Sequence, residues 1–196
     1  ILHGLASRGQ ISPARIDEAV TRVLRVKFAM GLFEHPGPVA AASKLVGNND
    51  HRALAREAVR KSQVLLKNQE ALPLRRGQRL LVAGTHADDL GLQSGGWTLV
   101  WSGFQGDNSR LPGATTLLAG LRQVGGDATP IEYSPTGDFS GPQADAAIVL
   151  VGEPPYSEWL GDRDADGLRL TVEDQALIAR LRPQARKLIL VLVTGR

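Results

Sequence analysis

Apolar residues recur at helical spacing in the first part of the chain. They lie three or four positions apart and are Ile16, Val20, Val23, Leu24 and Phe28. Ser12 and Pro13 precede them, and this pair is typical of a helix N-cap followed by proline at the first helical position. The pattern therefore predicts an amphipathic helix that begins after Ser12 and ends near Gly31.

The helical pattern is interrupted between Glu34 and Ser43. This stretch contains two prolines and several small residues, and each proline removes a backbone N–H that regular structure would use. We interpret it as a linker at a domain boundary. A second helix is predicted beyond it, capped by Asp50 and continuing to about Lys67, before Leu72-Pro73-Leu74 breaks the pattern.

From residue 79 onward the pattern changes to short apolar runs separated by helical segments. The runs are 79–84, 131–133, 146–152 and 188–193, and the helical segments are 117–124 and 172–181. This alternation indicates βαβ units and a mostly parallel sheet, so the predicted fold class is α/β. Ligands meet such sheets at the carboxyl ends of the strands, which directs attention to the loops after Gly84 and Gly152.

Both ends of the chain predict a piece of a longer protein. The chain begins Ile1-Leu2-His3-Gly4, with no initiator methionine and no signal-peptide zones. At the other end, the buried-strand pattern of residues 187–193 stops three residues before the last residue. A buried strand at the end of the chain needs neighbouring structure to cover it.

Composition excludes several classes of protein. Hydrophobic residues make up 42% of the 196 residues, enough for a real core, but no apolar run approaches the length of a membrane span. There is no cysteine, which excludes disulfides, thiolate metal sites and a cysteine nucleophile. Residues 1–80 are predominantly basic, yet their charges lie at helical spacing without interleaved aromatic residues, so a solvated helix face is the interpretation and no nucleic-acid partner is expected.

The loop after Gly152 could carry acid–base chemistry. Glu153 and Glu158 lie five positions apart in it, and Pro154, Pro155 and Tyr156 stand between them. A general acid is a carboxyl group that its surroundings hold in place and keep protonated, and a rigid acidic loop could supply one. The alternative is that both glutamates are ordinary solvated loop residues.

A pair of tryptophans could form a sugar-binding wall. Trp97 and Trp101 lie four positions apart beside glycines, and the C–H faces of sugar rings stack well on flat indoles. The alternative is that both indoles belong to the core.

Three polar residues after Gly84 invite a metal or phosphate interpretation, which the sequence supports poorly. They are His86, Asp88 and Asp89, and the acids could equally cap the following turn. No phosphate-binding glycine motif occurs, the histidines have no metal-ligand spacing, and Ser157 lies in no nucleophile elbow. No metal site is expected.

Taken in order, several strings along the chain resemble glycoside hydrolase family 3. These strings are Arg22–Phe33, His51–Ala58, Leu65–Asn68 with Leu72–Leu74, Val82–Gly84 with Ala87–Asp89, the double-tryptophan motif, the Gly152–Asp162 loop and Thr194–Arg196. They span nearly the whole chain. The subgroup that they resemble contains β-glucosidases and exo-acting β-glucan glucohydrolases of bacteria and plants.

The resemblance implies a (β/α)8-type barrel followed by a linker and an (α/β)6 sandwich domain. Residues 1–34 would be the C-terminal end of the barrel domain, 35–75 the linker with a connecting helix, and 76–196 a sandwich domain truncated at its C-terminus. The barrel domain of the same polypeptide would be the protein partner. No cofactor, nucleic acid or membrane is implied, and secretion or periplasmic residence is expected from the polymeric substrates of such families.

The resemblance also assigns roles to residues. Such enzymes hydrolyse terminal nonreducing β-D-glucosyl residues from β-glucosides or β-glucans with retention of configuration. The acid/base falls on Glu158, the wall of the leaving-group sugar site falls on Trp101, and Glu153 is expected to be a structural or hydrogen-bonding carboxylate. The family's aspartate nucleophile would lie before Ile1, so the isolated chain is expected to be inactive.

Two alternatives remain open at this stage. The chain could belong to another β-glycosidase of the family, a β-xylosidase or a β-N-acetylglucosaminidase. It could instead be a noncatalytic binding or scaffold α/β module.

Overall fold

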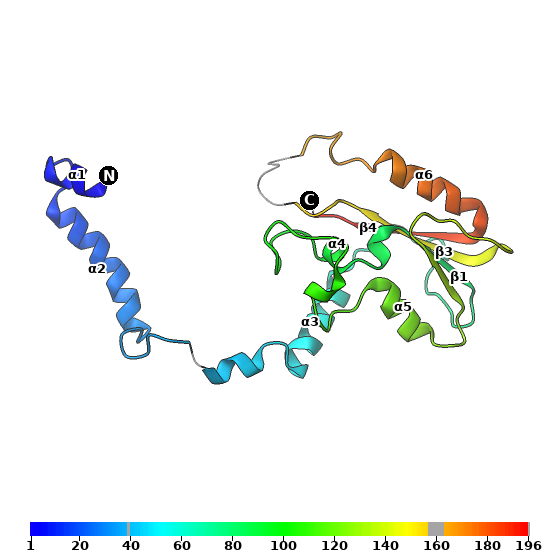
Figure 1. Cartoon of the computed structure of the whole chain (residues 1–196), viewed down its shortest axis with the longest axis horizontal. Coiled ribbons are helices and arrows are strands. Elements are labelled where there is room, and N and C mark those ends of the chain that lie inside the picture. Colours follow the sequence, from blue (N-terminus) through cyan, green and yellow to red (C-terminus); the bar gives the residue numbers. More distant parts are fainter. Residues whose placement is uncertain (39, 157–162, 196) are drawn as a thin grey trace. The chain divides into compact units, whose positions relative to one another are not determined.

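The computed structural model describes residues 1–38, 40–156 and 163–195. The chain forms two compact units, Ile1–Leu65 and Leu66–Arg196, and each is considered by itself (Figure 1). None of the helices in these described segments is both long and apolar enough to cross a membrane.

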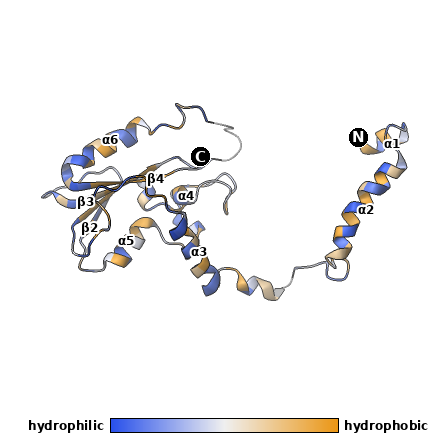
Figure 2. Cartoon of the chain, turned by 180° about the vertical axis from the view of Figure 1, so that it is seen from behind, coloured by the Kyte–Doolittle hydropathy of each residue, from blue (hydrophilic) through white to orange (hydrophobic). Residues whose placement is uncertain are grey.

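The first unit is helical. It contains α1 (Leu2–Ser7), α2 (Pro13–Ala29), the 3-10 helix η1 (Ala40–Leu45) and α3 (Asn49–Ser62). The Ser12 Oγ accepts a hydrogen bond from the Arg15 N–H at 3.3 Å, which confirms the predicted cap of α2. Hydrophobic and hydrophilic residues alternate along α2 in Figure 2, and within this unit Val23 and Phe28 stay exposed.

The predicted boundaries of α3 are wrong at both ends. Asn48, not Asp50, caps the helix, because its extended backbone lets its Oδ1 accept from the His51 N–H at 2.8 Å. The helix stops at Ser62 rather than near Lys67. The Val59 carbonyl in its last turn accepts from the side chains of Ser62 and Gln63, and Gln63 itself is extended.

The second unit is built on a four-stranded parallel sheet. Its strands are β1 (Leu80–Ala83), β2 (Ile131–Ser134), β3 (Ala144–Gly152) and β4 (Ala185–Val193), in the order β2-β1-β3-β4. Every pairing is parallel, with Leu80 of β1 opposite both Ile131 and Ala146. The α/β class and the mostly parallel sheet predicted from the sequence are therefore confirmed.

One helix covers each face of this sheet. In Figure 1, α6 (Val172–Leu181) lies above the strands and α5 (Leu117–Gly125) lies below them. Alternate residues of β1 and β3 face the two helices, so that Leu81 and Val149 pack with Leu181 of α6, whereas Val82 and Leu150 pack with Leu118 of α5. The apolar run 146–152 within β3 follows from burial on both faces.

Short elements not anticipated from the sequence complete the unit. They are the 3-10 helices η2 (Thr85–Ala87), η3 (Asn108–Arg110) and η5 (Arg182–Gln184) and the helix α4 (Leu90–Ser94). Three of them, η2, α4 and η3, follow β1 along the chain, and they shape the edge of the sheet where the candidate site lies.

Candidate active site

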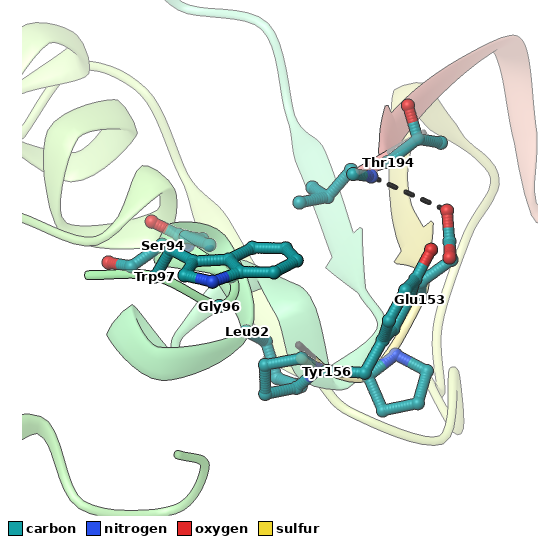
Figure 3. A pocket seen from close by; sticks show the side chains of 13 residues that line it. Leu92, Ser94, Gly96, Trp97, Glu153, Tyr156 and Thr194 are labelled. Carbon is teal, nitrogen blue, oxygen red and sulfur yellow. Dashed lines mark hydrogen bonds between the residues drawn. The ribbon is translucent and has the colours of Figure 1, made fainter. Parts of the chain in front are cut away.

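A pocket of about 160 Å³ lies at the carboxyl ends of β1, β3 and β4. Three segments line it: 92–97 at the end of α4, 153–156 after β3, and 193–195 at the end of β4. In Figure 3 the Trp97 indole extends into the pocket from one side, and Tyr156, Glu153 and Thr194 lie on the other. The pocket therefore lies among the loops that a parallel sheet presents to ligands, as predicted.

Glu153 is fixed to the end of β4. Its Oε1 accepts from the Gly195 N–H at 3.4 Å, drawn as the dashed line in Figure 3, and its own N–H donates to the Val193 carbonyl at 3.1 Å. Its side chain is only 17% exposed, and Oε2 lies 3.9 Å from Nη2 of Arg163. These contacts are those of a carboxylate that holds neighbouring segments together.

Glu158 lies within residues 157–162, outside the part of the chain that the structure describes. Its flanking residues are described. Tyr156 lines the pocket, and the Arg163 guanidinium carbon lies 4.9 Å from the centre of the Tyr156 ring.

The two tryptophans lie on one tight loop, and neither belongs to the core of this unit. Trp97 is 54% exposed and Trp101 46% exposed, and the Trp97 N–H donates to the Trp101 carbonyl at 2.8 Å. Trp97 has a positive φ of 52°, and its indole lines the pocket. The residues that line this pocket do not include Trp101.

The tryptophan loop packs against the acidic loop through a glycine. Gly103 has a φ of 79°, and a Cβ placed on it would lie 2.2 Å from the Cβ of Pro155. A side chain at position 103 would therefore both strain the backbone and push the two loops apart. The absence of a side chain at position 103 therefore lets the segment that carries the tryptophans approach Pro155, two positions after Glu153.

Polar residues after β1 support the site. Asp89 caps α4, because its carboxylate accepts a hydrogen bond from the Leu92 N–H at 3.0 Å. The same carboxylate also accepts from the Gly106 N–H at 2.7 Å. The Asp88 carboxylate accepts from the Thr116 hydroxyl at 2.7 Å. The capping alternative is thereby confirmed for Asp89. Among the residues that the structure describes, no group of three or more histidine or acidic side chains could hold a metal ion.

Tyr133 lies on the neighbouring strand β2, beside these acids. Its hydroxyl donates to the Gly84 carbonyl at 3.4 Å. Burial, followed by the negative charges of Asp88 and Asp89, raises the pKa of Tyr133. The phenol therefore remains a neutral donor beneath the site.

Sequence reasoning did not assign His86, Arg163 or Gly195 a role around Glu153, although it considered His86 as a metal or phosphate ligand. The buried His86, 6% exposed, has its Nε2 at 3.3 Å from the Glu153 carbonyl, and Gly195 and Arg163 both contact the Glu153 side chain. None of them lies next to Glu153 in the sequence. A signal was available for His86 and Gly195, because each follows a predicted strand end at the same edge of the sheet.

Comparison with protein families assigns most of the chain. Residues 63–196 match the family described as "Glycosyl hydrolase family 3 C-terminal domain". This match covers the whole of the sheet and its two helices.

Individual relatives agree with the family match. The chain is 30% identical over 217 aligned positions to the lysosomal β-glucosidase of Dictyostelium discoideum, an alignment that covers all of this chain and 26% of that protein. It is 28% identical over 242 positions to the periplasmic β-glucosidase of Salmonella typhimurium, covering all of this chain and 30% of that protein. The chain thus spans less than a third of the length of these relatives.

A solved structure shares the fold. The exo-1,3/1,4-β-glucanase ExoP of a Pseudoalteromonas species superposes with a TM-score of 0.83 and 37% sequence identity, over 96% of this chain and 24% of that one. The (α/β)6 sandwich expected from the resemblance is therefore the fold to which this second unit belongs.

Proposed function

The chain belongs to glycosyl hydrolase family 3, and on that premise we propose that it is part of an enzyme that hydrolyses terminal nonreducing β-D-glucosyl residues with retention. The observation that carries the proposal is the contact between two loops at the carboxyl edge of the parallel sheet. One loop exposes two indoles and the other leads into the segment of Glu158. Relatives named β-glucosidase and exo-β-glucanase support the choice of glucoside as substrate.

We assign Glu158 the role of general acid and base. In the first step, an aspartate elsewhere in the polypeptide attacks the anomeric carbon while the Glu158 carboxyl gives its proton to the departing oxygen, whose bond to carbon breaks. In the second step, the Glu158 carboxylate takes a proton from water, which attacks the same carbon and releases the aspartate. Two inversions leave the configuration retained.

This mechanism requires a second carboxyl group about 5 to 5.5 Å from the first. We propose that it is provided by a (β/α)8-type barrel domain of the same polypeptide, of which residues 1–34 form the C-terminal end. Residues 35–75 are then the linker and connecting helix, and 76–196 the sandwich domain. The exposed apolar side chains of α2 support this division, since a barrel helix buries such a stripe against its neighbours.

The names of the relatives also support a location outside the cytosol. One is lysosomal and another periplasmic. We propose that the intact enzyme is secreted or periplasmic, where glucans and their oligosaccharides are met as substrates.

The substrate proposal is tested by kcat/KM of the intact enzyme on 4-nitrophenyl β-glycosides. The kcat/KM for the β-glucoside is expected to exceed that for the β-xyloside and that for the N-acetyl-β-glucosaminide by at least about tenfold. A pocket that binds the hydroxymethyl and 2-hydroxyl groups of glucose loses contacts with the xyloside, which lacks the hydroxymethyl group, and lacks space for the N-acetyl group. A preference for one of the other two glycosides would assign the enzyme to that activity. Hydrolysis of none of the three would favour a noncatalytic module.

Replacing Trp101 with alanine in the intact enzyme is expected to weaken binding of the leaving-group sugar. An indole wall contributes contact area to the sugar. Its loss should therefore weaken the binding free energy of a β-linked disaccharide, measured through its inhibition constant, by about 1 to 3 kcal/mol. Because Trp101 is 46% exposed, the melting temperature should change little. Trp97→Ala is the matched comparison: a larger effect there would move the wall to Trp97, and an unchanged inhibition constant in both variants would contradict a tryptophan wall.

A further inference from the structure

Arg163 holds together the two ends of the segment that contains Glu158. Its guanidinium carbon lies 4.9 Å from the centre of the Tyr156 ring, within the range of a cation–π contact. Tyr156 immediately precedes residues 157–162, and Arg163 immediately follows them. The two residues that flank 157–162 are therefore in contact with each other.

The same guanidinium is paired with Glu153. Nη2 of Arg163 lies 3.9 Å from Oε2 of Glu153, and the two side chains are only 26% and 17% exposed. Arg163 Nε and Glu153 Oε2 are buried and have no hydrogen-bond partner in the described part of the chain. The separation makes this a charge pairing, and low exposure leaves it little screened by solvent.

Glu153 is itself held in place by hydrogen bonds, so its pairing with Arg163 attaches that arginine to a rigid part of the unit. Its backbone and side chain are both bonded to the end of β4, through Val193 and Gly195. Pro155, between Glu153 and Tyr156, packs against Gly103 of the tryptophan loop. The contacts of the Arg163 side chain with Glu153 and Tyr156 therefore lead back to the sheet edge and to the loop that carries the tryptophans.

We propose that Arg163 is a positioning residue for the acid/base, acting through Glu153 and Tyr156 to fix both ends of the segment that delivers Glu158 to the glycosidic oxygen. The inference rests on the proposed function, because it takes Glu158 as the proton donor. Arg163 is not a catalytic residue: it acts on the reacting atoms only through the placement of the loop. Displacement of a proton donor by about 1 Å costs up to about 100-fold in rate.

The test compares two substrates in the intact enzyme. Methyl β-glucoside needs protonation of its leaving group, whereas 2,4-dinitrophenyl β-glucoside does not. Arg163→Gln is expected to lower kcat/KM for the methyl glucoside by about 10- to 100-fold and for the dinitrophenyl glucoside by less than about threefold. Arg163→Lys, which keeps the charge but loses the planar guanidinium, should fall between the wild type and Arg163→Gln.

The ratio of the two kcat/KM values does not depend on how much enzyme is folded, so it separates positioning from stability. If Arg163 were purely structural, each variant would lower kcat/KM for the two substrates by the same factor. The ratio would then be unchanged, and that result would overturn the proposal. Arg169→Ala is the matched control, because Arg169 is a solvated arginine of the same loop region whose side chain pairs with the exposed Asp166 at 3.3 Å. Its ratio should remain that of the wild type.

Glu158→Ala, measured in parallel, distinguishes the two ways in which the idea can fail. If Glu158→Ala shows the selective loss and Arg163→Gln does not, the positioning role is wrong and the proposed function stands. If Glu158→Ala shows no selectivity, the acid/base assignment itself is wrong, and the positioning role falls with it.

Discussion

Glu158→Ala in the intact enzyme is expected to lower kcat/KM for methyl β-glucoside by about 10³-fold, within the range attributed to general acid catalysis. The methoxide leaving group is strongly basic, so its departure without a proton is unfavourable. A dinitrophenolate departs readily without one, and the first step on dinitrophenyl β-glucoside should be nearly unaffected. The comparison is made on kcat/KM of both substrates, measured with the same enzyme preparation at concentrations well below KM. This constant reports the first step, whereas kcat also includes the second step, which lacks its base in this variant.

A matched control for this variant is Glu173→Ala. Glu173 is an exposed glutamate in the first turn of α6, and its removal should leave kcat/KM for both substrates at the wild-type value. A Glu158→Ala enzyme whose kcat/KM fell by the same factor for the two substrates would show that Glu158 acts in binding or folding rather than in proton transfer.

Gly84→Ala is expected to destabilise the sandwich unit by roughly 4 kcal/mol or to prevent folding, among the largest effects of a single substitution. Gly84 immediately follows β1 and has a φ of 98°, and an added Cβ would lie 1.9 Å from the backbone carbonyl oxygen of Leu150 in β3. A strand in the centre of a parallel sheet cannot move aside without breaking its ladder bonds. Soluble yield and the apparent melting temperature of the intact protein measure the effect.

Gly126→Ala separates the clash from the cost of the backbone conformation. Gly126 also has a positive φ, 62°, but a Cβ there would meet nothing within 4 Å. This variant should lose only about 1 to 3 kcal/mol, the cost of holding a residue with a Cβ at φ 62° and ψ −167°, a backbone conformation that glycine alone adopts readily. A Gly84→Ala protein at least as stable as Gly126→Ala would contradict the close approach of β1 and β3.

The sheet was predictable from the sequence because its strands carry their own signal. A strand buried on both faces must be apolar at every position, and the run that forms β3 satisfies this condition almost throughout. The helix caps were less predictable. Asn48 and Asp50 have the same capping chemistry two positions apart, and only the backbone conformation selects Asn48.

The site was predictable as a region but not residue by residue. The rule for parallel sheets selects the loop after Gly152, yet it does not say which indole enters the pocket. That depends on the positive φ of Trp97 and the hydrogen bond from its N–H to the Trp101 carbonyl, both products of the folded loop. The pairing of Arg163 with Glu153 likewise joins positions with no periodic relation in the sequence.

The central claim is that this chain supplies the acid/base of a retaining β-glucosidase, and azide tests it most directly. Azide attacks the glycosyl-enzyme without needing a base, so it should restore turnover of dinitrophenyl β-glucoside in Glu158→Ala. NMR of the product should show β-glucosyl azide, the retained anomer. Rescue of Glu153→Ala together with no glucosyl azide from Glu158→Ala would contradict the claim and move the acid/base to Glu153.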